Sequence, residues 1–294
     1  MKISIAATTD IGKERTNNED AFLICPDLSE QDWSLSETPS YIKLGKYGSL
    51  LIVADGMGGP KAGEIASSMA IQSIQQSFSS HAIENALKNN SIKKFLHTCI
   101  IGADDAINQK MFEDPDTSGM GTTIVVCWII ENTAHIAWCG DSRCYVYNPL
   151  HGLKPLTKDH SLVQELIDKG EITEKEAFTH PDNSVITRGL GDFDAQSEPD
   201  IVTYSLKPND TILMCSDGLC GFCTNDEISK ILDDNFIDIK KCRDELLKIA
   251  LNAGGYDNIC ITLASLIGEE QTTPLRPTTL QKLVFNLKRL LHFS

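Results

Sequence analysis

The chain has 294 residues, of which 41% are hydrophobic, and its 41 Asp and Glu outnumber its 26 Lys and Arg to give a net charge of −15. A chain of this length can bury the core of one large domain or of two small ones. The acidic surface disfavours nucleic acid as a partner, because phosphates bind to basic side chains.

The start of the chain and its cysteines favour a cytoplasmic protein. No apolar run approaches the ~20 residues that span a bilayer, and the stretch from Met1 to Asp10 is too short and polar for a secretory signal. We therefore expect a soluble protein whose ten cysteines are reduced and mostly buried. Cys220 and Cys223 have the spacing of a zinc ligand pair, but no second pair accompanies them, so we interpret them as structural.

Hydrophobic periodicity predicts strands and helices in alternating groups. In chain order, the first half is predicted to form strands at 3–8, 20–25 and 50–54, helices at 62–78 and 92–111, and strands at 122–130, 134–139 and 144–147. The second half is predicted to form helices at 162–170 and from 173, strands at 201–205 and 211–215, helices at 226–233 and 239–252, and a strand at 259–266. Strand groups that alternate with helix pairs favour α+β layers with antiparallel sheets over a doubly wound parallel sheet.

Two segments fall outside this pattern. Residues 26–48 carry Pro, Ser, Gly and acids without periodicity and are predicted to form a surface excursion or a hairpin. Residues 269–294 follow a domain at 1–268 and combine a linker with basic residues and an apolar stripe at helical spacing, made of Leu280, Leu283, Val284, Leu287 and Leu291. This tail could be a disordered appendage, a helix packed on the domain or a basic amphipathic helix on anionic lipid, and we favour the first two.

Four short motifs place an aspartate beside a glycine where a strand meets a turn. They are centred on Asp55-Gly56, Gly140-Asp141, Asp217-Gly218 and Asp257, which follows Gly255. Two unpaired carboxylates about 4 Å apart repel by roughly 4 kcal/mol at an effective dielectric near 20, so converging aspartates need cations. A single Asp-Gly pair can be a plain turn, but four together predict a site for Mg²⁺ or Mn²⁺, which prefer oxygen ligands.

Arg15 lies in a polar N-terminal segment that ends in Glu19 and Asp20. An arginine beside a carboxylate cluster can form a structural ion pair. It can also be the bidentate fork that receives a phosphate whose other side faces the metals. The segment by itself does not decide between these two roles.

Taken together, these motifs resemble those of the PPM family, the metal-dependent protein Ser/Thr phosphatases of type 2C, and most closely its compact bacterial members. The resemblance covers about residues 3–266 and rests on an ordered set: Arg15, Asn18-Glu19-Asp20, Asp55-Gly56-Met57-Gly58-Gly59, Gly63-Glu64, Gly121-Thr122-Thr123, Gly140-Asp141-Ser142-Arg143, Asp159-His160-Ser161, Thr187-Arg188, Ser216-Asp217-Gly218-Leu219 and Asp257-Asn258. It implies a four-layer α-β-β-α sandwich of two antiparallel sheets flanked by helix pairs. A metal cleft would lie at one edge, next to a mobile flap at about 160–181.

The resemblance also implies the metal ligands. Asp55 would bridge two tightly bound Mn²⁺ or Mg²⁺ ions, and the Gly56 carbonyl would bind one of them. Asp217 and Asp257 would hold the second ion. Asp141 would share a weaker third metal with Asp217.

The remaining site residues would act through water or on the substrate. Glu19 and Asp20 would contact the metals through bound waters, and Arg15 would bind the phosphate. The implied reaction is direct hydrolysis of phosphoserine or phosphothreonine by a metal-bridging hydroxide, without a phosphoenzyme. The implied partners are phosphorylated proteins and a cognate Ser/Thr kinase, and we expect a monomer.

One feature departs from the family pattern. Some members carry a histidine directly after the first Asp-Gly, and many bacterial members carry it after Asp-Gly-Met-Gly-Gly, where it can protonate the departing alkoxide. This chain has Met57 and Pro60 at those positions. We expect a metal-bound water or another side chain to take that role, and aryl phosphates to be hydrolysed well relative to phosphoserine peptides.

Other conspicuous side chains are expected to be structural. Arg143 and Arg188 should brace loops by ion pairs, and His160 borders the flap without an assigned role. The three tryptophans should make core or hairpin contacts; they are Trp33, Trp128 and Trp138.

Two alternatives to an active protein phosphatase stay open. A catalytically silent relative that only binds partners would be marked by loss of the metal aspartates, but Asp55, Asp217 and Asp257 are all present. A hydrolase of small phosphoesters would use the same chemistry, because a metal site recognises the phosphoryl group and not what it is attached to.

Overall fold

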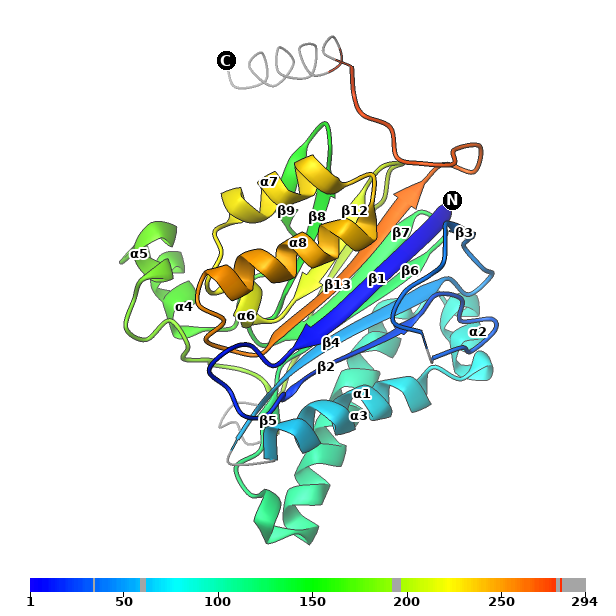
Figure 1. Cartoon of the computed structure of the whole chain (residues 1–294). Coiled ribbons are helices and arrows are strands. Elements are labelled where there is room, and N and C mark those ends of the chain that lie inside the picture. Colours follow the sequence, from blue (N-terminus) through cyan, green and yellow to red (C-terminus); the bar gives the residue numbers. More distant parts are fainter. Residues whose placement is uncertain (34, 59–61, 192–196, 279–280, 282–294) are drawn as a thin grey trace.

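Two antiparallel sheets lie face to face in this protein, and helices cover the outer face of each sheet (Figure 1). Figure 1 shows the computed structural model, which describes residues 1–33, 35–58, 62–191, 197–278 and 281. The order of layers is helix, sheet, sheet, helix. This arrangement confirms the predicted four-layer α-β-β-α sandwich.

The first sheet has six strands in the order β3-β1-β13-β12-β8-β9. Their bounds are β1 Lys2–Asp10, β3 Ile42–Lys43, β8 Arg143–Asn148, β9 Gly152–Pro155, β12 Thr211–Cys215 and β13 Ile259–Ile267. Strands β1 and β13 form a long antiparallel pair in which Asp10 lies opposite Ile259. The end of β1 and the start of β13 therefore meet at the same edge of the sheet.

The second sheet has seven strands, with the order β10-β5-β4-β6-β7-β11 and with β2 beside β4. Their bounds are β2 Asp20–Cys25, β4 Ser49–Met57, β5 Gly121–Thr122, β6 Ile124–Ile130, β7 Thr133–Cys139, β10 Leu190–Gly191 and β11 Asp200–Ser205. Strand β4 continues past the predicted end at residue 54, because Gly56 and Met57 pair with Thr122 and Gly121. Asp55 thus lies inside a strand and not in a turn.

The helices divide between the two outer layers and the flap. Helices α1 Ala62–Ser77, α2 Ser80–Lys88 and α3 Ile92–Glu113 lie on the second sheet, and α7 Asn225–Asn235 and α8 Ile239–Asn252 lie on the first (Figure 1). The segment predicted to be a flap contains α4 Leu162–Asp168 and α5 Glu174–Phe178, while the short helices η1 Pro115–Thr117 and α6 Asp217–Cys220 lie in loops. Periodicity did not predict α2, which buries only Ile83 and Ala86, or α6, which is too short to show a period.

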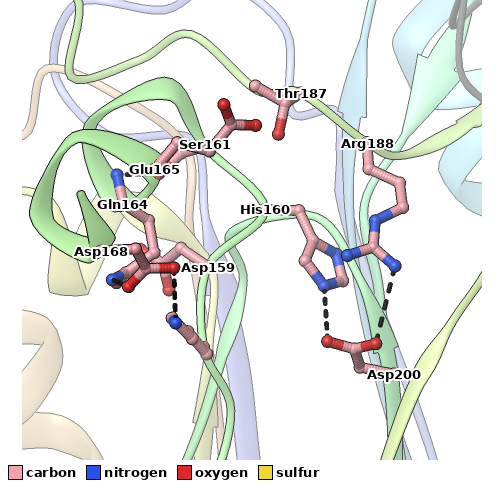
Figure 2. A pocket seen from close by; sticks show the side chains of 10 residues that line it. Asp159, His160, Ser161, Gln164, Glu165, Asp168, Thr187, Arg188 and Asp200 are labelled. Atoms are coloured by element: carbon pink, nitrogen blue, oxygen red, sulfur yellow. Dashed lines mark hydrogen bonds and ion pairs between the residues drawn. The ribbon is translucent and has the colours of Figure 1, made fainter.

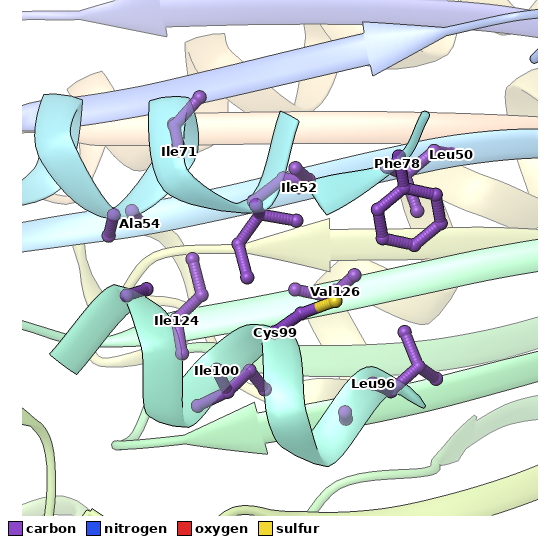
Figure 3. Packing of buried hydrophobic residues seen from close by; sticks show 14 of the residues in the cluster. Leu50, Ile52, Ala54, Ile71, Phe78, Leu96, Cys99, Ile100, Ile124 and Val126 are labelled. Atoms are coloured by element: carbon purple, nitrogen blue, oxygen red, sulfur yellow. The ribbon is translucent and has the colours of Figure 1, made fainter. Parts of the chain in front are cut away.

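Strand β4 explains how the layers are held together. Its side chains alternate between the two faces of the sheet: Leu50, Ile52 and Ala54 pack against the helices α1 and α3 (Figure 3), and Leu51 and Val53 pack against the first sheet. Fully burying each such Leu or Ile stabilises the fold by about 1.5–3 kcal/mol. A strand buried on both faces reads as a continuous apolar run, which is why the sequence revealed it.

The cysteines and tryptophans have the structural roles that the sequence predicted. All ten cysteines are free and buried, including Cys220 and Cys223. Trp128 and Trp138 lie in the core, and Trp33 packs against it. These side chains stabilise the fold by being buried in the core or by packing against it.

Residues 26–33 and 35–48 cover the exposed edge of the first sheet. Ser36 and Thr38 exchange main-chain hydrogen bonds with β1 at 2.8 and 2.9 Å, and β3 pairs with the same strand. Glu37 binds Arg243 of α8 at 2.8 Å. The predicted surface excursion therefore protects an edge strand from pairing with other chains.

The start of the C-terminal segment lies against the domain. Pro274 is buried, the Leu275 N–H donates to Asn209 Oδ1 at 2.9 Å, and the Arg276 guanidinium lies 5.2 Å from the centre of the Phe236 ring. The predicted apolar stripe from Leu280 onward lies outside the described residues. Within the described part of the chain, no helix combines the length and apolarity needed to cross a membrane.

Candidate metal centre

The predicted metal ligands come from separate segments that meet at one edge of the sandwich. Asp20 and Asp55 lie directly opposite each other on the paired strands β2 and β4. Asp217 follows the end of β12, and Asp257 precedes the start of β13. Because β12 and β13 are antiparallel neighbours, these two ends lie together. Asp141 joins them from the turn between β7 and β8.

The carboxylates in this group are close enough to disfavour each other's charged form. Burial, and then the charge of Asp257, raises the pKa of Asp217 to about 6. Burial, and more weakly the charge of Asp217, raises the pKa of Asp20 to about 8. Burial and Asp20 raise the pKa of Asp55 well above its usual value, and burial and Asp217 do the same for Asp141. Crowded, buried carboxylates of this kind are costly unless a cation compensates them.

Asp141 gives the clearest sign that a cation fits here. Its Oδ1 is buried and has no hydrogen-bond partner among the described residues, and an orphaned buried acceptor indicates a missing water or ion. As placed in the described part of the chain, no group of three or more His, Cys, Asp or Glu side chains could hold a metal ion. Mg²⁺ keeps several waters and needs only a few carboxylates, so neighbouring all-oxygen donors suit a hard divalent cation.

The glycines after two of these aspartates allow main chains to approach each other closely. A Cβ on Gly56 would lie 2.1 Å from the Gly63 carbonyl oxygen, and a Cβ on Gly218 would lie 1.9 Å from that of Asn258. Neither glycine has a positive φ, so turn conformation does not explain them. Close approach at two of the motifs supports the interpretation of a built site over that of plain turns.

Asn258 holds the N-terminal segment against this edge. Its Nδ2 donates to the carbonyls of Ile11 and Asn17 at 3.0 and 2.9 Å, and its Oδ1 accepts from the Glu19 N–H at 2.8 Å. The Glu19 carbonyl in turn accepts from the Gly56 N–H at 3.2 Å. The sequence showed Asn258 only as part of a motif, although a buried asparagine must find partners for its amide.

Two threonines fix the main chain of Asp55. The Asp55 carbonyl accepts from the Thr123 N–H and from Thr122 Oγ1, both at 2.8 Å, and the Asp55 N–H donates to Thr123 Oγ1 at 3.1 Å. These bonds explain the Gly-Thr-Thr motif at 121–123, to which sequence reasoning gave no role. Both β-hydroxyls are buried and therefore need such partners.

Arg15 lies at the rim of the carboxylate group. Its Nη2 donates to Asp257 Oδ2 at 2.7 Å, and the side chain is 53% exposed. The hydrogen bond that Arg15 donates to Asp257 raises the pKa of Arg15, and the charges of Asp217 and Glu19 raise it more weakly. The ion pair that the sequence allowed is therefore formed, and it leaves the guanidinium half exposed beside the aspartates.

The two motif arginines brace loops, as predicted. Arg143 binds Asp159 through Nε and Nη2, at 2.9 and 2.7 Å, and Arg188 lies 3.6 Å from Asp200. Beside Arg188, a pocket of about 180 Å³ opens against α4 (Figure 2). Ligand pockets usually exceed about 300 Å³, so this pocket is too small to be the main substrate site.

Comparison with known proteins finds similarity to phosphatases. The family model of protein phosphatase 2C matches residues 9–259. Protein phosphatase PhpP of Streptococcus pneumoniae is 34% identical over 269 residues, which cover 91% of this chain and 99% of PhpP. The serine/threonine phosphatase stp of Listeria monocytogenes is 35% identical over 214 residues, 73% of this chain and 83% of stp.

Solved structures agree with this result. The Mycobacterium tuberculosis serine/threonine phosphatase PstP/Ppp superposes with a TM-score of 0.75 at 29% identity, over 91% of this chain and 100% of that one. The catalytic domain of PstP in complex with two manganese ions has a TM-score of 0.71 at 27% identity, over 91% and 99% of the two chains. The chain therefore belongs to the protein phosphatase 2C family and is a phosphoprotein phosphatase.

Proposed function

We propose that this chain is a Mn²⁺- or Mg²⁺-dependent phosphatase of phosphoserine and phosphothreonine in proteins. The observation that carries the proposal is the orphaned Oδ1 of Asp141, in a site where burial and neighbouring carboxylates raise the pKa values of Asp55, Asp141 and Asp217. Similarity to phosphatases named for serine and threonine supports the substrate class. The partners would be phosphorylated proteins and a cognate kinase, and the chain would act as a cytoplasmic monomer.

In this proposal each aspartate has its own part. Asp55 would contribute to both ions, the Gly56 carbonyl would bind one of them, and Asp217 and Asp257 would hold the second. Asp141 would share a weaker third ion with Asp217. Glu19 and Asp20 would contact the ions through water. When bound, these ions supply an activated water and polarise the phosphoryl group for in-line attack.

Arg15 would orient the phosphate. Its pairing with Asp257 at 2.7 Å keeps the guanidinium beside the ligand group, and a guanidinium offers further N–H donors in a fixed plane. These donors can bind the phosphoryl oxygens that face away from the ions. Asn258 supports the same geometry, because it fixes the carbonyls of Ile11 and Asn17 on both sides of the Arg15 loop.

Protonation of the leaving group is the part of the reaction that differs from the family pattern. Met57, the last residue of β4, carries no proton to donate, and Pro60 lies outside the described residues. Water, or a side chain other than these two, therefore protonates the departing serine or threonine oxygen. This step should limit substrates with poor leaving groups more than aryl phosphates.

Initial rates on three substrates test the proposal. A phosphothreonine peptide, p-nitrophenyl phosphate and a nucleoside monophosphate would be compared with Mn²⁺, with Mg²⁺ and with EDTA. We expect metal-dependent turnover of the peptide and the aryl phosphate, and little turnover of the nucleotide. Turnover of the nucleotide alone would favour a small-phosphoester hydrolase, and no turnover with any metal would favour a silent binding protein.

A further inference from the structure

His160 makes an unusual set of contacts with the turn that carries Asp141. Its main-chain N–H donates to the Gly140 carbonyl at 3.0 Å, and its ring Nδ1 accepts from the Gly140 N–H at 3.1 Å. Both main-chain polar groups of Gly140 are therefore bound by one residue. Gly140 directly precedes Asp141, so these two bonds fix the main chain from which the Asp141 side chain extends.

The second ring nitrogen fixes the tautomer. Because Nδ1 accepts a hydrogen bond, Nε2 carries the proton of the neutral ring, and it lies 3.2 Å from Asp200 Oδ2 (Figure 2). The ring also stacks on Trp138 with an interplanar angle of 10° and with centroids 5.9 Å apart. Burial and the nearby Arg188 lower the pKa of His160, which keeps the acceptor on Nδ1 available.

The turn itself has little room to adapt. Gly140 has a φ of +117°, and a Cβ at this position would lie 2.6 Å from Cβ of Thr123, the threonine that also binds the Asp55 N–H. On the other side of Asp141, Arg143 is held by its ion pair with Asp159. Residues 159 and 160 thus clamp the Asp141 turn from both ends.

The same histidine is also the base of the flap. The His160 carbonyl accepts from the Thr187 N–H at 2.9 Å, and the Leu162 N–H donates to the Val185 carbonyl at 2.9 Å. These bonds close the segment that contains α4 and α5. His160 therefore links this segment directly to Gly140.

We propose that His160 is a positioning residue that couples the flap to the Asp141 carboxylate. Its neutral ring holds Gly140 by the Nδ1 acceptor, and Asp200 keeps the ring in the required tautomer. Loss of the acceptor would release Asp141 from its place beside Asp217 and weaken the cation that the two share. This inference rests on the proposed function of Asp141 as a metal ligand.

Two substitutions separate the two ring nitrogens. His160→Asn keeps an oxygen acceptor near the position of Nδ1, whereas His160→Gln places its amide N–H near Nε2 and loses the acceptor. Both substitutions remove the imidazole ring that stacks on Trp138, so the loss of this packing is common to the two variants. Asp200→Asn is the matched control, because its Oδ1 still accepts from Nε2 and its side chain is half exposed.

The direct readout is Mn²⁺ binding by calorimetry or electron paramagnetic resonance, followed by kcat and KM on a phosphothreonine peptide. We expect His160→Gln to weaken the weakest Mn²⁺ site by about tenfold to a hundredfold and to lower kcat with it. His160→Asn should retain most of the binding, and Asp200→Asn should match the wild type. Asp200→Ala, a change at an exposed position, should weaken the same site by about threefold.

Equal Mn²⁺ isotherms for His160→Gln and His160→Asn would overturn the inference and leave His160 with a packing role only. Should His160→Gln fail to fold, a comparison of Asp200→Ala with Asp200→Asn takes its place, since equal isotherms for that pair would also overturn the inference. A wild-type protein without metal-dependent turnover would instead refute the proposed function, and this inference with it. The two failures are therefore distinguishable.

Discussion

Strand β12 has an aspartate at each end, and the two have opposite surroundings. Asp210, before the strand, is fully buried, and its two oxygens accept from Asn148 Nδ2 at 2.7 Å and from the Lys207 N–H at 2.8 Å. These donors oppose the effect of burial on the pKa of Asp210. Asp217, after the strand, has the charge of Asp257 beside it, which adds to the effect of burial on its pKa.

Under the proposed function, the difference separates a structural carboxylate, Asp210, from a metal-binding one, Asp217. A buried aspartate with a donor for each oxygen braces the chain. An aspartate placed among other carboxylates destabilises the folded protein unless a cation is supplied, and such an arrangement persists where function requires it. The role of an aspartate at either end of this strand therefore depends on which groups surround its carboxylate.

The largest expected effect comes from the same substitution at both ends of β12. Asp217→Asn should lower kcat by about a hundredfold to a thousandfold, because it removes a ligand charge from the reaction centre. Asp210→Asn should leave kcat within about twofold and lower the free energy of unfolding by about 1 kcal/mol through a weakened hydrogen bond. Steady-state kinetics on a phosphopeptide and urea unfolding would measure the two effects. Similar kinetic losses at the two ends would remove the distinction.

The second prediction concerns pH and metal. The pKa values of Asp20 and Asp217 in the folded protein, about 8 and about 6, lie above the ordinary value of 3.8. Between pH 3.8 and these values, the folded state therefore binds more protons than the unfolded state. Stability of the protein in EDTA should therefore fall as pH rises from 5 to 7, by up to about 1.4 kcal/mol per pH unit for each carboxyl that titrates. Saturating Mn²⁺ should flatten this dependence, because a bound cation favours the charged forms.

Thermal melts across this pH range would test it. Asp217→Asn should raise the melting temperature in EDTA at pH 7 and reduce the pH dependence, because it removes one of the repelling charges. Asp210→Asn should lower the melting temperature and keep most of that dependence. A melting temperature in EDTA that rises between pH 5 and 7 would contradict the predicted loss of stability with rising pH.

Substitutions of Arg15 test the proposed contact with the substrate phosphate. Arg15→Ala should lower kcat/KM by about tenfold to a hundredfold, the range for loss of charge-assisted hydrogen bonds to phosphate. Arg15→Lys should recover part of the loss, because it keeps the charge but not the planar fork. Arg243→Ala is a matched control, since Arg243 pairs with acids on a different face and should leave kinetics unchanged. Inhibition by inorganic phosphate should weaken in parallel with kcat/KM.

The smallest expected effect tests the proton donor and not the metal ligands. Pro60→His restores the histidine that many bacterial family members carry, and it should raise the rate on a phosphoserine peptide up to about tenfold, within the range of general acid catalysis. The rate on p-nitrophenyl phosphate should stay unchanged, because its leaving group needs little protonation. Met57→His, at the other family position, serves as the comparison variant. An equal change on both substrates would exclude this explanation.

Local signals in the sequence were enough for most of the elements. The bounds of β2 and α8 match the predicted 20–25 and 239–252, and the capping box of α5, between Thr173 and Glu176, is present. Each of these depends on residues a few positions apart. The two misses have different causes. Helix α2 is short and buries only Ile83 and Ala86, and β4 runs past residue 54 because it pairs with β5.

The sequence by itself determined the fold class and the family, because apolar periodicity and short motifs are read along the chain, and it predicted which aspartates would form the metal site. Only the tertiary structure decided what each motif residue contacts. Arg15 meets Asp257 across 242 positions, and Asn258 reaches back to the carbonyls of Ile11 and Asn17. His160 binds both main-chain groups of Gly140. Such partners are set by the packing of strands that are distant in sequence, and no local pattern carries that information.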